Sequence, residues 1–134
     1  MNENIKKLTK SLRLNQALTE AVWNSVTSKI NFRLAGDYLE FIKESNGGEG
    51  TVGNNGYIQL WCFDELIEAN QDYQVEEFAP SLFLIGSNGG GTAYGVKKST
   101  GTFIDVPFIG MSDEAAADCG ETFVDFLSFL SSQD

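Results

Sequence analysis

The chain has 134 residues, 42% of them apolar, which is the size and composition of one compact domain spanning residues 1–134. It contains no histidine and two cysteines, a composition that excludes the usual general base, the commonest zinc ligand and a zinc knuckle. Its net charge of −10 would repel a nucleic-acid backbone, so we expect no direct binding of nucleic acid.

The acidic charge is distributed unevenly along the chain. Residues 1–34 carry six basic and two acidic side chains, whereas residues 35–134 carry three lysines and seventeen acids. Such an acidic body attracts a basic partner from a distance. The alternative interpretation is that the net charge only keeps the protein soluble. Residues 1–13 are candidates for a basic N-terminal arm that packs on the acidic body or pairs with a second copy, so a homodimer remains open.

Neither a signal peptide nor a membrane span is predicted. Residues 1–16 contain lysines but no apolar run of sufficient length, and nowhere do about 18 apolar residues follow one another. We interpret Cys62 and Cys119 as small buried side chains in a reducing compartment rather than as a disulfide. A cytoplasmic protein with no membrane partner is therefore expected.

The N-terminal third of the chain predicts two helices and a glycine-rich loop. Apolar residues at every fourth position predict an amphipathic helix over 14–30, with the stripe Leu14, Leu18, Val22, Val26 and Ile30. A second helix is predicted to end at Ser45–Gly48, where asparagine or glycine supplies a left-handed cap. Residues 46–56 hold five glycines and three asparagines and are predicted to be a mobile loop.

The middle of the chain predicts a strand and then a helix. Residues 57–61 have strand composition, and Asp64 and Glu65 follow where a helix start exposes unpaired backbone N–H groups. This helix is expected to end before Pro80. Its predicted inward residues are Leu66, Ala69 or Asn70, and Tyr73.

The second half of the chain predicts three strands and a closing helix. Residues 82–85 are apolar on both faces, as in a covered central strand, and 92–97 with 102–106 form a predicted antiparallel hairpin that Pro107 ends. Thr122 opens the last helix, whose apolar residues are Phe123, Phe126, Leu127 and Leu130. This order of elements predicts an α+β arrangement on a small antiparallel sheet.

No catalytic or metal-binding constellation is predicted. The turn Gly86–Gly91 lacks the lysine and the following helix of a phosphate-binding loop, so a tight hairpin connection is expected. Asp64, Glu68 and Asp72 would share one helix face, as paired carboxylates do in hydrolases and metal sites, yet a third ligand is missing. We interpret them as a solvated acidic face and expect no enzyme, cofactor or metal; an acidic enzyme using a divalent metal is the remaining alternative.

Four short motifs follow one another along the chain: GDYLEFIKESNGG at 36–48, LIGSNGGGTAYG at 84–95, VPF at 106–108 and TFVDFL at 122–127. Together they resemble the SUKH superfamily, also called the Smi/Knr-type family, although Leu34-Ala35 stands where the family has a Leu-Pro pair. The resemblance implies an α+β fold with a single twisted, mainly antiparallel sheet flanked by helices, and no catalytic motif. In bacteria it implies an immunity protein that neutralises a toxin domain, often a nuclease or nucleic-acid deaminase; eukaryotic relatives are regulatory scaffolds in cell-wall synthesis.

The leading functional hypothesis is an immunity protein that binds a cognate basic toxin domain and covers its active site or substrate groove. The alternative is a non-catalytic regulatory scaffold without a toxin partner. Carboxylates of the acidic body would face the partner. Trp61 would supply an aromatic anchor, although the simplest interpretation of this residue is that it packs in the core. The predicted partner-binding residues are Glu40, Glu44, Glu49, Trp61, Asp64, Glu65, Glu68 and Asp72.

Overall fold

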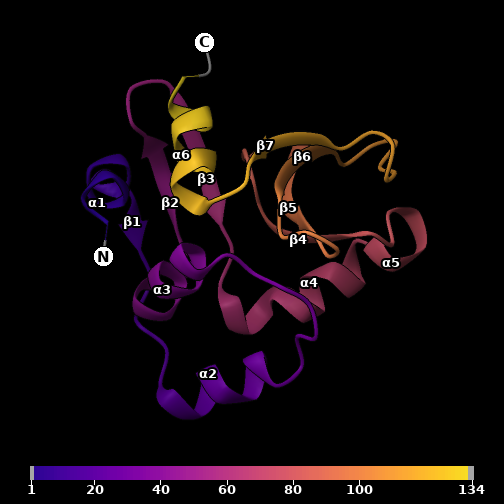
Figure 1. Ribbon diagram of the computed structural model, residues 1–134, viewed down its shortest axis with the longest axis horizontal. Coiled ribbons are helices and arrows are strands. Elements are labelled where there is room, and N and C mark those ends of the chain that lie inside the picture. The colour runs from indigo at the N-terminus through magenta and orange to yellow at the C-terminus, as the bar shows by residue number, and fades with distance from the viewer. Residues whose placement is uncertain (1, 133–134) are drawn as a thin grey trace.

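The computed structural model describes residues 2–132, which contain one seven-stranded sheet with every neighbouring pair of strands antiparallel (Figure 1). The strands lie side by side in chain order, and the sheet is strongly curved. The predicted α+β class with a single antiparallel sheet is confirmed. The strands are β1 (Arg13–Leu14), β2 (Gly48–Val52), β3 (Gly56–Leu60), β4 (Leu82–Ser87), β5 (Thr92–Lys97), β6 (Phe103–Pro107) and β7 (Ala117–Gly120).

Helices pack on the curved sheet from two sides. The closing helix α6 contacts β2, β3 and β7 and also packs against α1 and α3, whereas α4 and α5 contact β4 (Figure 1). The helices are α1 (Glu3–Thr9), α2 (Glu20–Thr27), α3 (Gly36–Ser45), the 3-10 turn η1 (Phe63–Glu65), α4 (Leu66–Asp72), α5 (Val75–Phe78) and α6 (Phe123–Ser131).

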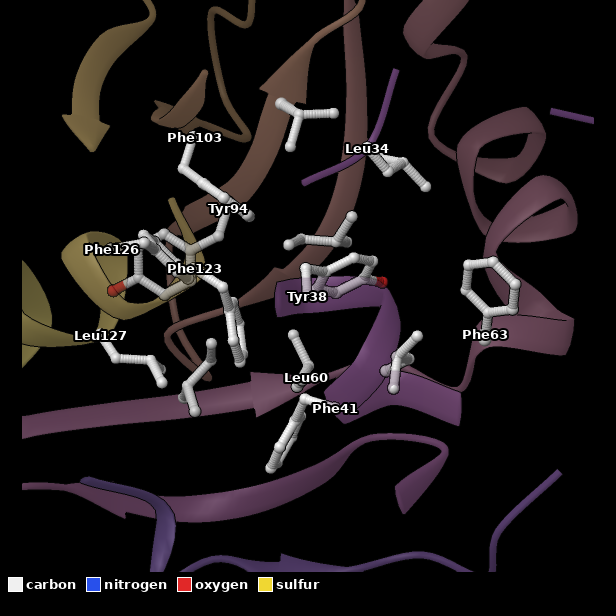
Figure 2. Packing of buried hydrophobic residues seen from close by; sticks show 14 of the residues in the cluster. Leu34, Tyr38, Phe41, Leu60, Phe63, Tyr94, Phe103, Phe123, Phe126 and Leu127 are labelled. Carbon is white, nitrogen blue, oxygen red and sulfur yellow. The ribbon is translucent and has the colours of Figure 1, made fainter. Parts of the chain in front are cut away.

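Two hydrophobic cores lie on opposite faces of β4. Phe83 and Ile85 enter the main core, which Figure 2 shows as a cluster of aromatic rings from α3, α6 and the central strands. The neighbouring Leu82 and Leu84 enter a second core beneath α5 and the β6–β7 segment. Because successive side chains of a strand point to opposite faces, β4 is covered on both sides, as the apolar run at 82–85 predicts.

The predicted helix over 14–30 is wrong in its extent, because α2 occupies only Glu20–Thr27. The Thr19 hydroxyl accepts a hydrogen bond of 3.3 Å from the Val22 N–H and caps the start of this helix. Leu14 lies instead in β1, paired with Gly48. The apolar residues spaced four apart therefore lie partly in a strand and a loop and not in one helix. The backbone of that strand and loop pairs with residues that are remote in sequence.

The predicted mobile loop at 46–56 is also wrong, since β2 and the start of β3 lie there. Asn46 adopts the left-handed conformation (φ 53°) and ends α3 as predicted. Gly48 allows β1 to approach closely, because a Cβ built on it would lie 2.5 Å from the Arg13 carbonyl oxygen. Glycine in this segment permits strand packing rather than mobility.

The sequence does not predict the two edge strands, β1 and β7. Residues 3–14 contain α1 and β1, and Ile5 and Leu12 are buried in the main core, so the basic N-terminal segment packs on the domain. At the other edge, β7 is short and carries exposed Ala117 and Asp118, which leave no alternating apolar pattern. A homodimer stays a prediction.

Tyr38 places a hydroxyl at the centre of the main core. The side chain is fully buried, with its ring edge-on to Phe103 and Phe123 at centroid distances of 6.2 and 5.5 Å (Figure 2). Its Oη has no hydrogen-bond partner among the residues that the structure describes. Burial raises the pKa of this hydroxyl far above its usual value of about 10.

Replacing Tyr38 with phenylalanine is expected to increase the free energy of unfolding by about 1 kcal/mol at pH 7, because it removes a buried, unpaired polar group. The gain should grow above about pH 10, where unfolded tyrosine ionises and the buried hydroxyl stays neutral, so that the parent protein loses stability as the pH rises. Urea denaturation at pH 7 and pH 10.5 measures both effects. A loss of stability at pH 7 would mean that the hydroxyl has a partner, and Tyr73→Phe, at an exposed site, is the control.

Candidate partner-binding groove

An open groove of about 850 Å³ lies between the first three strands and α4. One wall comes from β1 and the residues after it, the floor from β2 and β3, and the second wall from η1 and α4. We use "the groove" for the surface lined by Arg13, Asn15, Gly48, Glu49, Gln59, Leu60, Trp61, Cys62, Glu65, Ala69, Asp72 and Tyr73.

One face of the η1–α4 segment forms the acidic wall. Glu65, Ala69, Asp72 and Tyr73 all line the groove, and their spacing places them on one side of a helix. The small Ala69 side chain separates the two carboxylates and leaves free volume between them. This wall therefore presents two negative charges and an aromatic ring around a recess.

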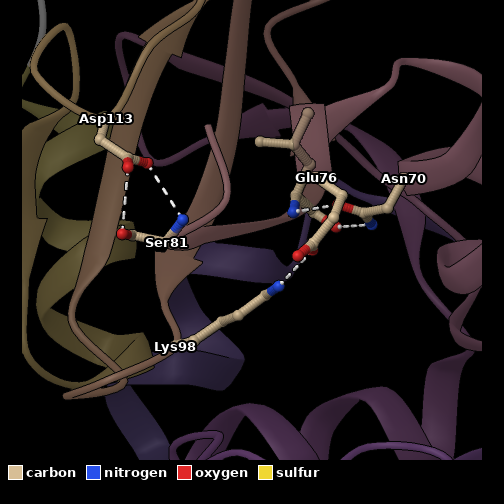
Figure 3. Close-up of polar contacts among 6 residues, drawn as sticks. Asn70, Glu76, Ser81, Lys98 and Asp113 are labelled. Carbon is tan, nitrogen blue, oxygen red and sulfur yellow. Dashed lines mark hydrogen bonds and ion pairs between the residues drawn. The ribbon is translucent and has the colours of Figure 1, made fainter. Parts of the chain in front are cut away.

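A neighbouring face of α4 fixes the helix to the sheet. Leu66 is fully buried, and the Asn70 amide binds the backbone of β4 twice: its Oδ1 accepts from the Leu84 N–H at 2.8 Å, and its Nδ2 donates to the Leu84 carbonyl at 3.0 Å (Figure 3). Of the residues predicted to face inward, Leu66 and Asn70 do so, but Tyr73 is 46% exposed, and that prediction is wrong. The Asn70 contacts set the rotation of α4, which turns Tyr73 into the groove.

Two aromatic side chains of the groove lining form a row with a third ring that lies outside the lining. The rings of Trp61 and Tyr73 are nearly parallel (11°) with centroids 5.7 Å apart, and Tyr73 also contacts Phe108 at 4.9 Å. Asp113 fastens the segment that follows Phe108, since its carboxylate accepts hydrogen bonds from the Ser81 N–H and hydroxyl, both at 3.1 Å (Figure 3). The row thus combines partly exposed rings from three separate elements on a fixed support.

A polar chain on the floor orients a third carboxylate. The Tyr57 hydroxyl donates to Glu49 Oε2 at 3.1 Å, and Gln59 Nε2 donates to the Tyr57 hydroxyl at 3.4 Å. Glu49 is exposed and lies opposite Arg13 in the register of β1 and β2. Its carboxylate is therefore held at the rim of the groove.

The groove is acidic and its carboxylates are available. Glu49, Glu65 and Asp72 line it against a single basic residue, Arg13. Within residues 2–132 none of these four side chains takes part in an ion pair. A basic partner can therefore bind these carboxylates without first breaking an ion pair.

The structure brings together four of the eight predicted partner-binding residues: Glu49, Trp61, Glu65 and Asp72. The others lie outside the groove lining. Asp64 accepts a hydrogen bond from Asn46 at the end of α3, Glu68 is exposed elsewhere on α4, and Glu40 and Glu44 are exposed on α3.

Sequence reasoning missed Arg13, Tyr73 and Phe108. Helical spacing from Glu65 and Ala69 would have found Tyr73, since it shares their face. Strand pairing brings Arg13 into the groove lining, and the β6–β7 segment brings Phe108 onto Tyr73 outside the lining. The sequence has no local signal for either contact.

Cys62 lies inside the groove, half-buried and free of any disulfide. Its Sγ accepts a hydrogen bond from Asn15 Nδ2 at 3.3 Å. Burial raises the pKa of the Cys62 thiol, and the charges of Glu65 and Asp64 raise it further, so little thiolate forms at neutral pH. Cys119 is also free and is buried, and burial together with the nearby Asp105 raises its pKa to about 12.

Glu65→Gln is expected to speed alkylation of Cys62 by iodoacetamide at pH 8 by about threefold, because losing the neighbouring charge lowers the thiol pKa. Peptide mass spectrometry separates this reaction from that of the less reactive Cys119. Glu68→Gln removes an equal charge outside the groove lining and should leave the rate unchanged. Equal alkylation rates for the parent protein and Glu65→Gln would contradict the position of the Glu65 carboxylate beside the Cys62 thiol.

Residues 2–132 contain neither a metal-binding cluster of side chains nor a membrane-spanning helix. No group of three histidine, cysteine, aspartate or glutamate side chains in this range is arranged to hold a metal ion. No helix in the same range is long and apolar enough to cross a membrane.

Fold and groove together define an α+β domain with a meandering antiparallel sheet and an open recess of carboxylates and aromatic rings. The chain belongs to the SMI1 / KNR4 family (SUKH-1), whose sequence model matches residues 17–130. The resemblance seen in the four sequence motifs is thereby confirmed. No curated protein matches the chain. Arg13 and Asn15 lie before the matched region, so part of the groove wall comes from outside it.

Proposed function

We propose that this protein is an immunity protein that binds a basic toxin domain through the groove and blocks the toxin's active site or substrate channel. It acts by binding and catalyses no reaction, in the cytoplasm of the cell that it protects. Membership in the SUKH-1 family supports this class of function. The observation that carries the proposal is the set of three carboxylates that form no ion pair within residues 2–132 and lie beside stacked, partly exposed aromatic rings in one open groove.

The chemistry of nucleic-acid-targeting toxins supports an acidic inhibitor. A protein that grips phosphates does so with lysine and arginine, and those same side chains bind carboxylates. The net charge of −10 accelerates the encounter with such a partner, while half-buried aromatic rings supply the contact area that slows dissociation. Charge and aromatic surface thus account for separate parts of the affinity.

Coexpression tests the function directly. The chain is produced in a bacterial host together with toxin domains encoded beside its gene, and rescue of growth is scored. We expect rescue by the parent chain and a one-to-one complex of the purified proteins whose affinity falls as salt is raised from about 50 to about 300 mM.

Failure to rescue growth from any neighbouring toxin would overturn the proposal. Capture of a non-toxic protein in its place would favour the regulatory scaffold. A complex whose affinity is independent of salt would overturn the electrostatic part.

A further inference from the structure

We propose that the groove has a subsite for one arginine side chain of the partner, formed by the rings of Trp61 and Tyr73 and the carboxylates of Glu65 and Asp72. This inference rests on the proposed function, because it specifies what the groove recognises. It assigns the specificity of the groove to an arginine rather than to positive charge in general.

The shape of the acidic wall fits a long side chain with a flat charged end. Glu65 and Asp72 lie seven residues apart, which on a helix corresponds to about 10 Å along the axis. Between them the Ala69 methyl group leaves a recess that the methylene stem of an arginine can cover. An arginine that lies over this recess can place its guanidinium group beside one of the two carboxylates.

The aromatic rings add a requirement that carboxylates alone do not impose. Trp61 and Tyr73 both line the groove with their rings nearly parallel (11°), so the ring surface that they do not turn toward each other lies beside the carboxylates. A planar guanidinium stacks on such a surface and donates two parallel hydrogen bonds to a carboxylate. A lysine ammonium is compact and strongly hydrated and makes neither arrangement as well.

Arg13 restricts the arginine to the α4 side of the groove. It is the basic residue that lines the opposite wall, and it lies on β1 beside Glu49. Its positive charge repels a second guanidinium there and partly offsets the Glu49 carboxylate. Among the residues that line the groove, the Glu65–Asp72 wall is therefore the part that an incoming arginine meets away from Arg13.

Three capped pentapeptides test the subsite on the intact protein: one central arginine flanked by glycines, the same peptide with lysine, and the same with the neutral isostere citrulline. Binding is followed by NMR through the Trp61 indole N–H and the Ala69 and Tyr73 backbone amides. We expect saturable shifts at these groups with arginine, about fivefold weaker binding of lysine and about tenfold weaker binding of citrulline.

Variants locate the binding. Asp72→Asn and Tyr73→Leu change exposed side chains and should each weaken binding of the arginine peptide by about fivefold. Glu68→Gln, on the same helix but outside the groove lining, should leave it within about twofold.

Equal affinities for the arginine and lysine peptides would overturn the subsite and leave the proposed function standing on charge alone. Shifts confined to other surfaces, or the absence of saturable shifts, would also overturn it. Failure of the proposed function is a separate result, since it appears in growth rescue with the toxin.

Discussion

The double substitution Glu65→Gln with Asp72→Asn is expected to weaken binding of the proposed toxin partner by about 100-fold at low salt. Both carboxylates line the groove without an ion pair to any residue from 2 to 132. Each is therefore free to accept a charge-assisted hydrogen bond from a basic partner, and losing two such contacts of about 1.4 kcal/mol each gives this factor. Titration calorimetry with the purified toxin domain measures it.

The matched control removes the same two charges elsewhere. Glu44→Gln with Glu68→Gln changes exposed residues on α3 and α4 that do not line the groove. We expect this pair to weaken binding by less than about threefold, mainly through a slower association rate. If both double variants weaken binding equally, total charge rather than the groove determines the affinity. Raising the salt concentration to about 300 mM should shrink either effect.

Replacing Asp37 with alanine is expected to lower the free energy of unfolding by about 3 kcal/mol. Asp37 lies in the first turn of α3, and its two carboxylate oxygens accept hydrogen bonds from the first backbone N–H groups of α6: Phe123 at 2.9 Å and Val124 at 3.1 Å. One charged side chain therefore satisfies two otherwise unpaired donors and complements the helix dipole. Its loss leaves both partly buried donors without this acceptor.

The size of the Asp37 effect separates it from an ordinary helix cap. Asp37→Asn keeps one acceptor oxygen and should cost about half as much. Thr122→Ala removes the single cap bond of 3.1 Å to the Asp125 N–H and should cost about 1 kcal/mol. Urea denaturation at pH 7 compares the three variants. A loss of less than about 0.5 kcal/mol for Asp37→Ala would contradict the role of Asp37 in holding α3 and α6 together. The expected loss is large by comparison, since domains of this size are stable by only about 5–15 kcal/mol.

The position of the acidic wall could not be predicted from the spacing of residues along the chain. The pairing of Asp64 with Glu68 and of Glu68 with Asp72 is correct helical geometry, yet the groove is lined by Glu65 and Asp72 instead. The contacts of Asn70 with the β4 backbone set which face of α4 turns toward the sheet. Those contacts join residues 14 positions apart, and the spacing of acids along α4 contains no information about them.

The edges of the sheet illustrate the same limit. Leu14 continues an apolar stripe at helical spacing, but it pairs with Gly48 in a strand. Residues 46–56 have the glycine-rich composition of a loop. Gly48 nevertheless lies in a strand, and because it has no side chain, β1 can approach it more closely than another residue would allow. Both errors arise because a strand is stabilised by a partner that is remote along the chain.

The sequence by itself determined the elements whose signals are local: the left-handed end of α3 at Asn46, the doubly covered β4, the hairpin of β5 and β6, the capped α6, and the motifs of the SUKH-1 family. It also determined the acidic character of the surface. Only the tertiary structure decided which carboxylates share a groove with Trp61, Tyr73 and Arg13. The physical reason is that capping, periodicity and charge depend on near neighbours, whereas strand pairing and helix rotation depend on contacts between distant parts of the chain.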